Sequence, residues 1–313
     1  MNQLKKILKK QKILILDGAL GTRLQEKGFD LNDPLWSAKF LNENPKVLQD
    51  IHEEYLQAGA DCIISSTYQA SIEGFAKKGF SKDEAEKLLI LSIDIAKETR
   101  DKFWNKKINK VNRIKPLVAA SIGPYGAFLA DGSEYTGKYN ISLEKLKEFH
   151  KKRVKLIAKT NPDIFAVETI PTLEEAKILC ELLKEYKNIP NWISFSAKDD
   201  CHINGGDKIE DCAKYIDSQK HISTIGINCT SPQYILTLIK KIRDISDKNI
   251  VVYPNGGSKY NPITKNWEKS LTDEKEYAKM ALLWKQEGAN IIGGCCQTGP
   301  KEIKELREVL LNQ

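Results

Sequence analysis

The segment Ala289-Asn-Ile-Ile-Gly-Gly-Cys-Cys-Gln-Thr-Gly-Pro300 contains a short apolar run that is followed at once by two glycines and two adjacent cysteines. Ile291 and Ile292 are typical of a buried strand, and the Gly-Gly pair loosens the backbone where that strand ends. The same arrangement, an apolar and often β-branched run followed by polar residues or glycine, recurs along the chain. The runs occupy residues 13–16, 62–65, 117–120, 164–167, 192–195, 224–227, 250–253 and 291–292.

Amphipathic stretches with helical periodicity separate these runs. They occupy residues 45–58, 82–102, 142–159, 173–186, 232–245, 273–287 and 301–311, whereas residues 199–221 show the least regular pattern. Eight strands that alternate with helices in 313 residues predict an α/β protein with a (β/α)8 TIM barrel, formed as a single domain by residues 1–313. An open doubly wound sheet is the rival fold, but no Gly-x-Gly-x-x-Gly fingerprint follows any run. We expect residues 1–12 to form a helix or an extended arm.

Composition and charge exclude several classes of function. The chain is 41% hydrophobic and 29% charged, and no apolar run approaches the ~20 residues that span a membrane. Its net charge of +7 comes from lysines interleaved with glutamates, which argues against a nucleic-acid partner. Seven cysteines without framework spacing predict a reducing, cytoplasmic location, where cysteines more often bind metals or catalyse reactions than form disulfides. We expect small-molecule substrates and a monomer.

Chemically active side chains follow several of the predicted strands. Asp17 follows the first strand, Glu168 the fourth, Cys229 the sixth, and Cys295 and Cys296 the eighth. In a barrel all these strand ends lie on one rim, so the five side chains would share one cavity. Three sulfurs at two strand ends predict a zinc site with one open position. Two buried thiols that only pack, or a strained disulfide between adjacent cysteines, are the alternatives.

Seven segments, in the same order and running nearly end to end, resemble the homocysteine S-methyltransferase family. The segment that includes residues 131–135 is most similar to the branch that uses S-methylmethionine or S-adenosylmethionine, a relative of betaine–homocysteine methyltransferase. The segments are Leu16-Asp-Gly-Ala-Leu-Gly-Thr22, Pro34-Leu-Trp-Ser-Ala38, Ile122-Gly-Pro-Tyr-Gly-Ala-Phe-Leu-Ala-Asp-Gly-Ser-Glu-Tyr135, Val167-Glu-Thr-Ile-Pro171, Gly226-Ile-Asn-Cys229, Val252-Tyr-Pro-Asn255 and Gly293-Gly-Cys-Cys296.

The resemblance implies the same barrel fold and a catalytic Zn2+ bound by Cys229, Cys295 and Cys296. A free thiol has a pKa near 8.5, so homocysteine is mostly protonated and a poor nucleophile at neutral pH. Binding its sulfur as the fourth zinc ligand removes the proton. The implied reaction is methyl transfer from a sulfonium donor to the zinc-bound thiolate of homocysteine, giving methionine. S-methylmethionine is the expected donor, and S-adenosylmethionine is the alternative.

The resemblance also implies how the amino-acid substrate is held. Asp17 and Glu168 would bind the ammonium group of homocysteine through charge-assisted hydrogen bonds. The backbone of Gly18 and the side chain of Thr67 would bind its carboxylate. Asp17 could instead be an ordinary turn residue, because Asp-Gly is a common turn pair. Glu168 is harder to explain without a partner, since a carboxylate directly after a buried strand is costly to leave unpaired.

Aromatic residues near the same rim are candidates for binding the cationic donor. Trp36, Tyr68 and Tyr125 could form a wall that attracts a sulfonium through cation–π interactions, or they could simply pack. The loops formed by residues 18–44 and 122–141 would select the donor. Two further readings remain open: a selenocysteine methyltransferase, and a structural zinc protein or amino-acid-binding barrel without methyltransferase activity. A purely structural zinc site normally has four protein ligands.

Overall fold

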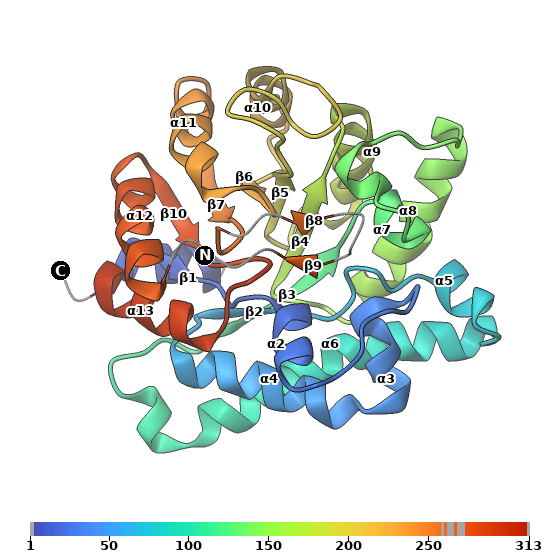
Figure 1. Ribbon diagram of the computed structural model, residues 1–313, viewed down its shortest axis with the longest axis horizontal. Helices are drawn as coiled ribbons and strands as arrows, with labels where there is room; N and C mark the ends of the chain where they lie inside the picture. The colour runs from blue at the N-terminus through green and yellow to red at the C-terminus, as the bar shows by residue number, and fades with distance from the viewer. Residues whose placement is uncertain (1–2, 258–259, 262–265, 268–272, 312–313) are drawn as a thin grey trace.

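Eight parallel strands form one sheet at the centre of the molecule, in the order β1-β10-β7-β6-β5-β4-β3-β2 (Figure 1). The computed structural model describes residues 3–257, 260–261, 266–267 and 273–311. All eight predicted runs are strands, and the predicted (β/α)8 barrel is confirmed. The strands are β1 (Leu14–Ile15), β2 (Cys62–Ile64), β3 (Leu117–Ile122), β4 (Ile164–Ile170), β5 (Asn191–Phe195), β6 (Thr224–Asn228), β7 (Asn249–Tyr253) and β10 (Ala289–Ile292).

The two edge strands of this sheet, β1 and β2, meet and close the barrel. Leu16 and Cys62 form a parallel bridge, and the Asp17 amide donates to the Cys62 carbonyl over 3.0 Å. On the other side of the bridge, the Asp61 amide donates to the Ile15 carbonyl over 2.7 Å. Closure removes the exposed edges that an open sheet would leave, and it places all eight carboxyl ends of the strands on one rim.

Helices surround the barrel, and local sequence signals start many of them. Ser81 and Glu84 form a capping box at the start of α6, and Asn44 caps α4 just before Pro45, as both residue patterns predict. The irregular region 199–221 contains the short helix α10. The α-helices are α1 (Gln3–Gln11), α2 (Leu20–Glu26), α3 (Phe40–Glu43), α4 (Pro45–Ala58), α5 (Ile72–Lys77), α6 (Lys82–Asn105), α7 (Tyr125–Leu129), α8 (Leu143–Lys159), α9 (Leu173–Leu183), α10 (Ile209–Ser218), α11 (Pro232–Arg243), α12 (Glu274–Gln286) and α13 (Pro300–Leu311).

Shorter elements occupy the connections. A two-stranded antiparallel hairpin pairs β8 (Tyr260–Asn261) with β9 (Asn266–Trp267). The 3-10 turns are η1 (Trp36–Lys39), η2 (Lys107–Lys110), η3 (Ser133–Tyr135) and η4 (Lys184–Tyr186). Within the part of the chain that the structure describes, no helix is long and apolar enough to span a membrane.

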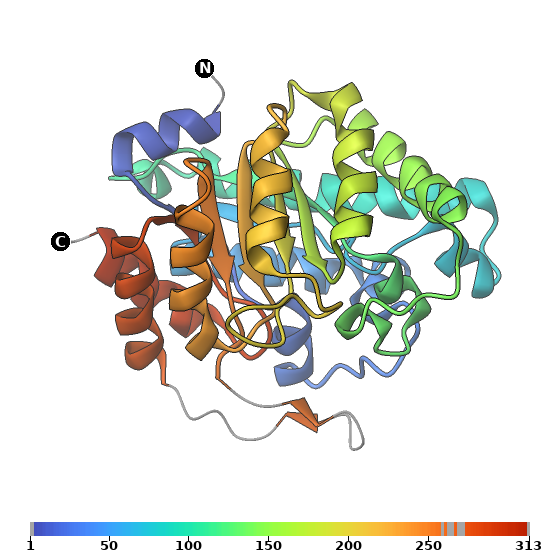
Figure 2. The same ribbon diagram turned by 90° about the horizontal axis from the view of Figure 1, so that it is seen from above.

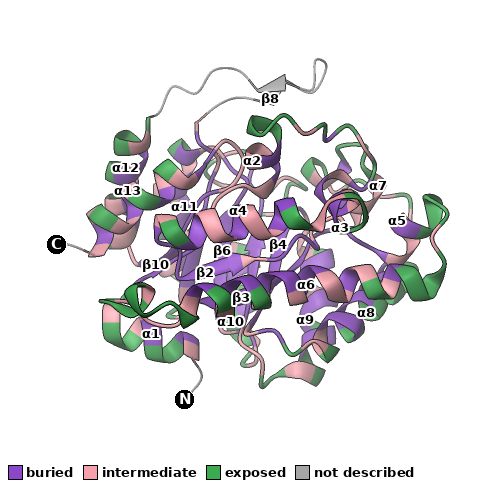
Figure 3. Ribbon diagram, turned by 90° about the horizontal axis from the view of Figure 1, so that it is seen from below, coloured by how far each residue is buried: buried purple, intermediate pink, exposed green. Residues whose placement is uncertain are grey.

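The N-terminal segment is the helix α1, and it covers the end of the barrel opposite the hairpin β8–β9 (Figure 2). Leu4 and Ile7 lie three positions apart, so they share one helix face, and both are buried against interior residues of the barrel such as Leu14 and Trp192. The strands form the buried centre of the molecule, whereas the surrounding helices expose their outer faces (Figure 3). The opposite rim, where the strands end, is therefore the face left for function.

Candidate active site at the carboxyl ends of the strands

The three predicted sulfur ligands converge at the ends of β6 and β10. The Sγ atoms of Cys229, Cys295 and Cys296 all lie within 4.8 Å of one another, and the Sγ atoms of Cys229 and Cys296 are 3.9 Å apart. All seven cysteines are free thiols, so no disulfide joins the adjacent pair. Among the described residues, no fourth histidine, cysteine or carboxylate joins this group. The cluster therefore lacks the fourth protein ligand that a structural zinc site normally has.

Main-chain hydrogen bonds to the end of β7 hold the cysteines in place. The Cys229 amide donates to the Tyr253 carbonyl over 3.2 Å, and the Cys295 amide donates to the Pro254 carbonyl over 2.8 Å. Cys229 itself has a φ of 49°, a left-handed conformation that a residue with a side chain adopts only when its surroundings impose it. The end of β7 is thus the support that fixes both sulfur-bearing loops.

Gly293 and Gly294, just before Cys295, are glycines for a reason other than the predicted backbone freedom. Neither Gly293 nor Gly294 has a positive φ among the described residues, so unusual backbone freedom is not what glycine supplies here. A Cβ on Gly293 would lie 2.4 Å from the Cβ of Leu16, and one on Gly294 would lie 2.1 Å from the Thr298 Oγ1. Glycine is needed because the chain passes too close to its neighbours to carry a side chain.

The three thiols influence one another's ionisation. Hydrogen bonds from the thiols of Cys295 and Cys296 hold the pKa of Cys229 well below its ordinary value. The same hydrogen bonds to Cys229 raise the pKa of Cys295 and of Cys296, so the cluster favours a single thiolate. A tetrahedral zinc ion with Zn–S bonds of about 2.3 Å would separate its sulfurs by about 3.8 Å. The spacing and the donor set therefore fit zinc.

Glu168 reaches the same rim from a bulge in β4. The register against β5 shifts between Val167 and Ile170, and such bulges commonly re-aim a side chain next to a functional site. Thr169 in the bulge has a φ of 61°, and its amide donates to the Asn228 Oδ1 over 2.7 Å. The bulge is thus held by the end of β6.

The carboxylate of Glu168 is buried and held by hydroxyl groups inside the barrel. The Ser121 hydroxyl donates to its Oε1, and the Tyr253 hydroxyl donates to its Oε2 over 2.9 Å. Trp192 Nε1 donates in turn to the Tyr253 hydroxyl over 3.0 Å. Burial raises the pKa of Glu168 from its ordinary value to about 7, although the two hydroxyl groups oppose that shift. A cation bound at this carboxylate would favour its charged form.

Asp17 is a second buried carboxylate close to Glu168. The Ile64 amide donates to its Oδ2 over 2.8 Å. Burial raises the pKa of Asp17 well above its ordinary value, and the charge of Glu168 raises it further. A buried carboxyl group whose pKa is raised by burial and by a second carboxylate forms a site that a cationic group would stabilise. Gly18 follows directly, and a Cβ there would lie 2.9 Å from the Thr298 carbonyl oxygen.

Thr67 lies below the rim. Its side chain is buried, and its hydroxyl donates to the Ser121 carbonyl over 2.7 Å, so the hydroxyl proton is used within the protein. The buried guanidinium of Arg153 donates to the carbonyls of Thr67 over 3.1 Å and Tyr68 over 3.2 Å. It also donates to the Gly123 carbonyl over 3.1 Å. Arg153 therefore ties together the loops that follow β2 and β3.

Two of the three predicted donor-side aromatic residues lie together. The rings of Trp36 and Tyr68 meet edge to face with centroids 6.3 Å apart. Trp36 has a φ of 48°, and its indole rests against Gly21, where a Cβ would lie 2.1 Å from Trp36 Cζ2. The ring of Tyr68 lies within the electrostatic influence of Cys229 and Glu168. These two residues therefore form an aromatic wall, and Tyr68 in this wall interacts electrostatically with Cys229.

Tyr125 does not share this position. Its ring packs against Phe128, Tyr139 and Phe149, with centroids 5.4, 5.5 and 5.0 Å away. Its amide donates to the buried carboxylate of Glu175 over 2.7 Å. The prediction that Tyr125 borders the donor is not supported by these contacts, because they place its ring within an aromatic cluster of its own.

The structure adds residues that sequence reasoning left without a role. The Tyr135 hydroxyl lies 3.5 Å from Cys229 Sγ, although 38% of that residue is exposed. Asn255 also hydrogen-bonds to the Cys229 thiol and helps to lower its pKa. Glu134 is a half-buried carboxyl group whose burial raises its pKa to about 7. All three residues lie in segments that stand out in the sequence only because they resemble the family. That resemblance is the signal in the sequence that could have pointed to these residues.

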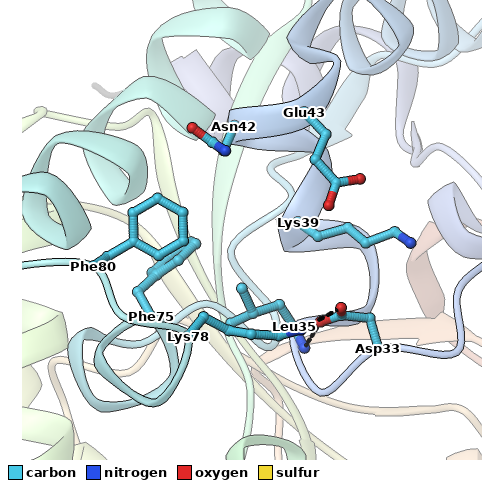
Figure 4. A pocket seen from close by; sticks show the side chains of 8 residues that line it. All are labelled: Asp33, Leu35, Lys39, Asn42, Glu43, Phe75, Lys78 and Phe80. Carbon is cyan, nitrogen blue, oxygen red and sulfur yellow. Dashed lines mark hydrogen bonds and ion pairs between the residues drawn. The ribbon is translucent and has the colours of Figure 1, made fainter.

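Two other features lie apart from this site. A surface cavity of about 110 Å3 separates η1 and α3 from α5 (Figure 4), and an ion pair of 2.7 Å joins Lys78 and Asp33 at its edge. None of the site residues lines it. The lining residues are Asp33, Leu35, Lys39, Asn42, Glu43, Phe75, Lys78 and Phe80.

The second feature is a group formed by Asp199, Asp200 and Cys201 in the loop after β5. The Lys241 ammonium already donates to Cys201 Sγ over 2.9 Å. Cys212 is a buried residue of α10 and does not belong to this group. Cys201 and Cys212 therefore do not form a cysteine cluster comparable to the one on the rim.

The fold and site place the chain among barrel enzymes that work at the carboxyl ends of their strands, and comparisons identify the family. Residues 14–310 match the homocysteine S-methyltransferase family. Homocysteine S-methyltransferase YbgG of Bacillus subtilis is 48% identical over 306 residues, covering 98% of this chain and 97% of the relative. Selenocysteine Se-methyltransferase of Brassica oleracea var. italica is 43% identical over 308 residues, covering 96% and 89%.

A solved structure agrees with these relatives. The metallated form of the homocysteine methyltransferase MmuM from Escherichia coli has a TM-score of 0.86 and 35% sequence identity, covering 98% of this chain and 99% of that one. The chain belongs to the homocysteine S-methyltransferase family and is a methyltransferase. The family resemblance predicted from seven sequence segments is confirmed.

Proposed function

We propose that this enzyme transfers a methyl group from a sulfonium donor to homocysteine and produces methionine. S-methylmethionine is the favoured donor, and S-adenosylmethionine is the alternative. The observation that carries this proposal is the cluster of three thiols within 4.8 Å of one another at the same rim as the buried carboxylates Asp17 and Glu168. The seven free thiols support a cytoplasmic location, which we include in the proposal.

Cys229, Cys295 and Cys296 would hold a catalytic Zn2+. When bound there, zinc would accept the substrate sulfur as its fourth ligand and remove the thiol proton, so that no separate general base is needed. The chain's own contribution is the spacing of the sulfurs, which fits a tetrahedral ion. The hydroxyl of Tyr135 and the amide of Asn255 lie at Cys229 and would orient this sulfur.

Asp17 and Glu168 would bind the ammonium group of homocysteine. Both carboxylates are buried and their pKa values are raised, and a cation between them would remove the cost of that burial. The Gly18 amide donates to no acceptor among the described residues, so it is available to the substrate carboxylate. Because the Thr67 hydroxyl already donates to Ser121, we propose that Thr67 supports this side of the site through its position.

Trp36 and Tyr68 would form the wall against which the donor binds. A sulfonium is attracted to the faces of aromatic rings by cation–π interaction. The methyl group would pass in line from the donor sulfur to the homocysteine sulfur. Because opposite charges disappear in this step, a site that excludes water favours the reaction.

Selenocysteine is the second candidate acceptor. A selenocysteine Se-methyltransferase is 43% identical to this chain, and a site built from three sulfur ligands would bind a selenolate as well as a thiolate. Selenocysteine is one methylene shorter than homocysteine, so the carboxylates at Asp17 and Glu168 would sit at a different distance from its reacting atom. Comparing the two acceptors under identical conditions would decide between them.

The test is a methyl-transfer assay on zinc-loaded protein with homocysteine and each donor in turn. The proposal predicts methionine formation with S-methylmethionine, and loss of activity when a chelator removes the zinc. An absence of turnover with every donor and both acceptors, despite one tightly bound zinc, would favour a structural or amino-acid-binding role. Turnover that survives complete removal of zinc would contradict the metal part of the proposal.

A further inference from the structure

Glu134 has an unpartnered oxygen at the donor side of the site. It lies in η3, within the loop 122–141 that the sequence predicted to select the donor. Its Oε2 is shielded from solvent and finds no hydrogen-bond partner among the described residues. A buried carboxylate oxygen without a partner is costly. A carboxylate that has a buried oxygen without a hydrogen-bond partner, next to a substrate site, is a candidate for binding a ligand.

Glu134 interacts electrostatically with both the aromatic wall and the cysteine cluster. Its charge raises the pKa of Tyr68 more than any other charged side chain does, and it interacts electrostatically with Cys229. The next residue, Tyr135, reaches Cys229 Sγ with its hydroxyl at 3.5 Å. Glu134 therefore borders the space in which the donor must approach the homocysteine sulfur.

The position of Glu134 is fixed by the main chain. A Cβ on Gly126 would lie 2.3 Å from the Glu134 amide nitrogen, so η3 packs directly on α7. The first turn of α7 is held in turn by the buried carboxylate of Glu175, which accepts from the Tyr125 amide over 2.7 Å. The His150 ring lies 2.8 Å from the same oxygen. The carboxylate of Glu134 is thus carried by a supported loop.

The electrostatic environment of Glu134 favours a cation. The charged groups that act on it are Cys229 and Asp131, and both would be negative when ionised. Together with Asp17 and Glu168, these groups offer more negative charge than the ammonium of homocysteine can neutralise. A sulfonium donor brings the positive charge that this side of the site would accommodate.

We propose that Glu134 binds the positive charge of the sulfonium donor and selects cationic methyl donors over their neutral thioether products. This inference rests on the proposed function. In the transfer, the bond between the methyl carbon and the donor sulfur breaks, and its electron pair stays on that sulfur, which becomes a neutral thioether. A lone pair of the homocysteine thiolate forms the new carbon–sulfur bond. Glu134 therefore attracts the positively charged sulfur of the donor, and the neutral sulfur of the product no longer offers that attraction.

This role has a distinctive kinetic signature. The attraction is greatest before the reaction, because the positive charge diminishes as the methyl group leaves. An interaction that is stronger in the ground state than in the transition state lowers KM for the donor without raising kcat. Glu134→Gln should therefore raise the donor KM by about 10- to 100-fold, as expected for losing the attraction between two opposite charges in a partly buried site, while kcat stays the same or rises.

The experiment measures initial rates with S-methylmethionine and S-adenosylmethionine, at saturating homocysteine, for the wild type and three variants. Glu134→Gln removes the charge, Glu134→Asp keeps it on a shorter side chain, and Glu148→Gln removes one negative charge from an exposed position on α8. We expect a large rise in donor KM for Glu134→Gln, a smaller one for Glu134→Asp, and none for Glu148→Gln. Calorimetric titration of S-methylmethionine should show affinity losses in the same order.

The two proposals fail in different ways. A donor KM within about twofold of wild type for Glu134→Gln would overturn the inference and leave the proposed function intact. A variant that loses zinc, or whose homocysteine KM rises as much as its donor KM, would also overturn it, because Glu134 would then have a structural role. A wild type that uses neither sulfonium as a donor would overturn both proposals.

Discussion

The two sides of the candidate site are built differently. On one side, Asp17, Glu168 and the three cysteines follow directly from strand ends, and the barrel's own hydrogen bonds fix them. On the other side, Trp36, Tyr68 and Glu134 belong to loops and short 3-10 turns outside the sheet. We therefore propose that activation of the acceptor is tied to the fold, whereas recognition of the donor is set by loops that can vary without disturbing it.

The largest effect should come from removing any one sulfur of the cluster. We expect Cys229→Ser, Cys295→Ser and Cys296→Ser each to abolish stoichiometric zinc binding and to lower methyl transfer by at least about 1000-fold, because the loss of metal activation removes several kcal/mol of transition-state stabilisation. Metal analysis and initial rates on the same samples measure both effects. Cys201→Ser is the matched control, and it should retain zinc and activity. A cluster variant that keeps wild-type turnover would contradict the assignment of these cysteines.

An intermediate effect should come from Glu168→Gln, which keeps the shape of the side chain and removes its charge. We expect the homocysteine KM to rise by about 10- to 100-fold, while zinc content and the donor KM change little. Steady-state kinetics in which each substrate is varied separately measure this. An equal rise in both KM values would show that Glu168 supports the whole rim and does not specifically bind homocysteine.

The raised pKa of Glu168 also leads us to expect that the stability of the metal-free protein depends on pH. Its pKa is raised from 4.5 to about 7 in the folded state, so the folded protein binds a proton that the unfolded chain releases. The associated stability is fully present below about pH 4.5 and is lost as pH rises through about 7. We expect Glu168→Gln to lose less stability than wild type over this interval, as measured by urea unfolding. Parallel curves for the two proteins would contradict the raised pKa.

The smallest effect should come from Gly21→Ala, which tests the loop side alone. The added methyl group would lie 2.1 Å from Trp36 Cζ2 and must displace the indole from Tyr68. Because a cation–π contact contributes about 0.5–2 kcal/mol, we expect the donor KM to rise by roughly 2- to 30-fold. The homocysteine KM and the zinc content should not change. Kinetics that alter for homocysteine as well would show that the two sides are not independent.

The site residues that follow strand ends could be predicted from the sequence. Apolar runs locate buried strands, and closing them into a barrel brings distant ends such as Asp17 and Cys296 to one rim. The convergence of the three sulfurs followed from this topology alone. The reason for Gly293 and Gly294 did not follow, because the contacts with Leu16 and Thr298 that exclude a side chain depend on packing between segments far apart in the sequence.

The positions of the loop residues on the other side of the site were harder to predict from the sequence. Tyr125 and Tyr68 are both aromatic residues that follow a strand closely, yet Tyr68 packs against Trp36, whereas Tyr125 packs against three other rings. Residue type and distance from a strand end do not distinguish these outcomes. Glu134 and Tyr135 belonged to a recognised segment, but their positions depend on the packing of η3 against Gly126, which periodicity does not reveal.

The most direct test of the central claim is X-ray absorption at the zinc edge of the loaded protein, before and after homocysteine is added. The account predicts a tetrahedral zinc with three sulfur neighbours from the cysteine cluster and one lighter ligand, and a fourth sulfur replacing that ligand when homocysteine binds. A zinc coordination sphere that is already filled by the protein, or a sulfur count that homocysteine leaves unchanged, would contradict it.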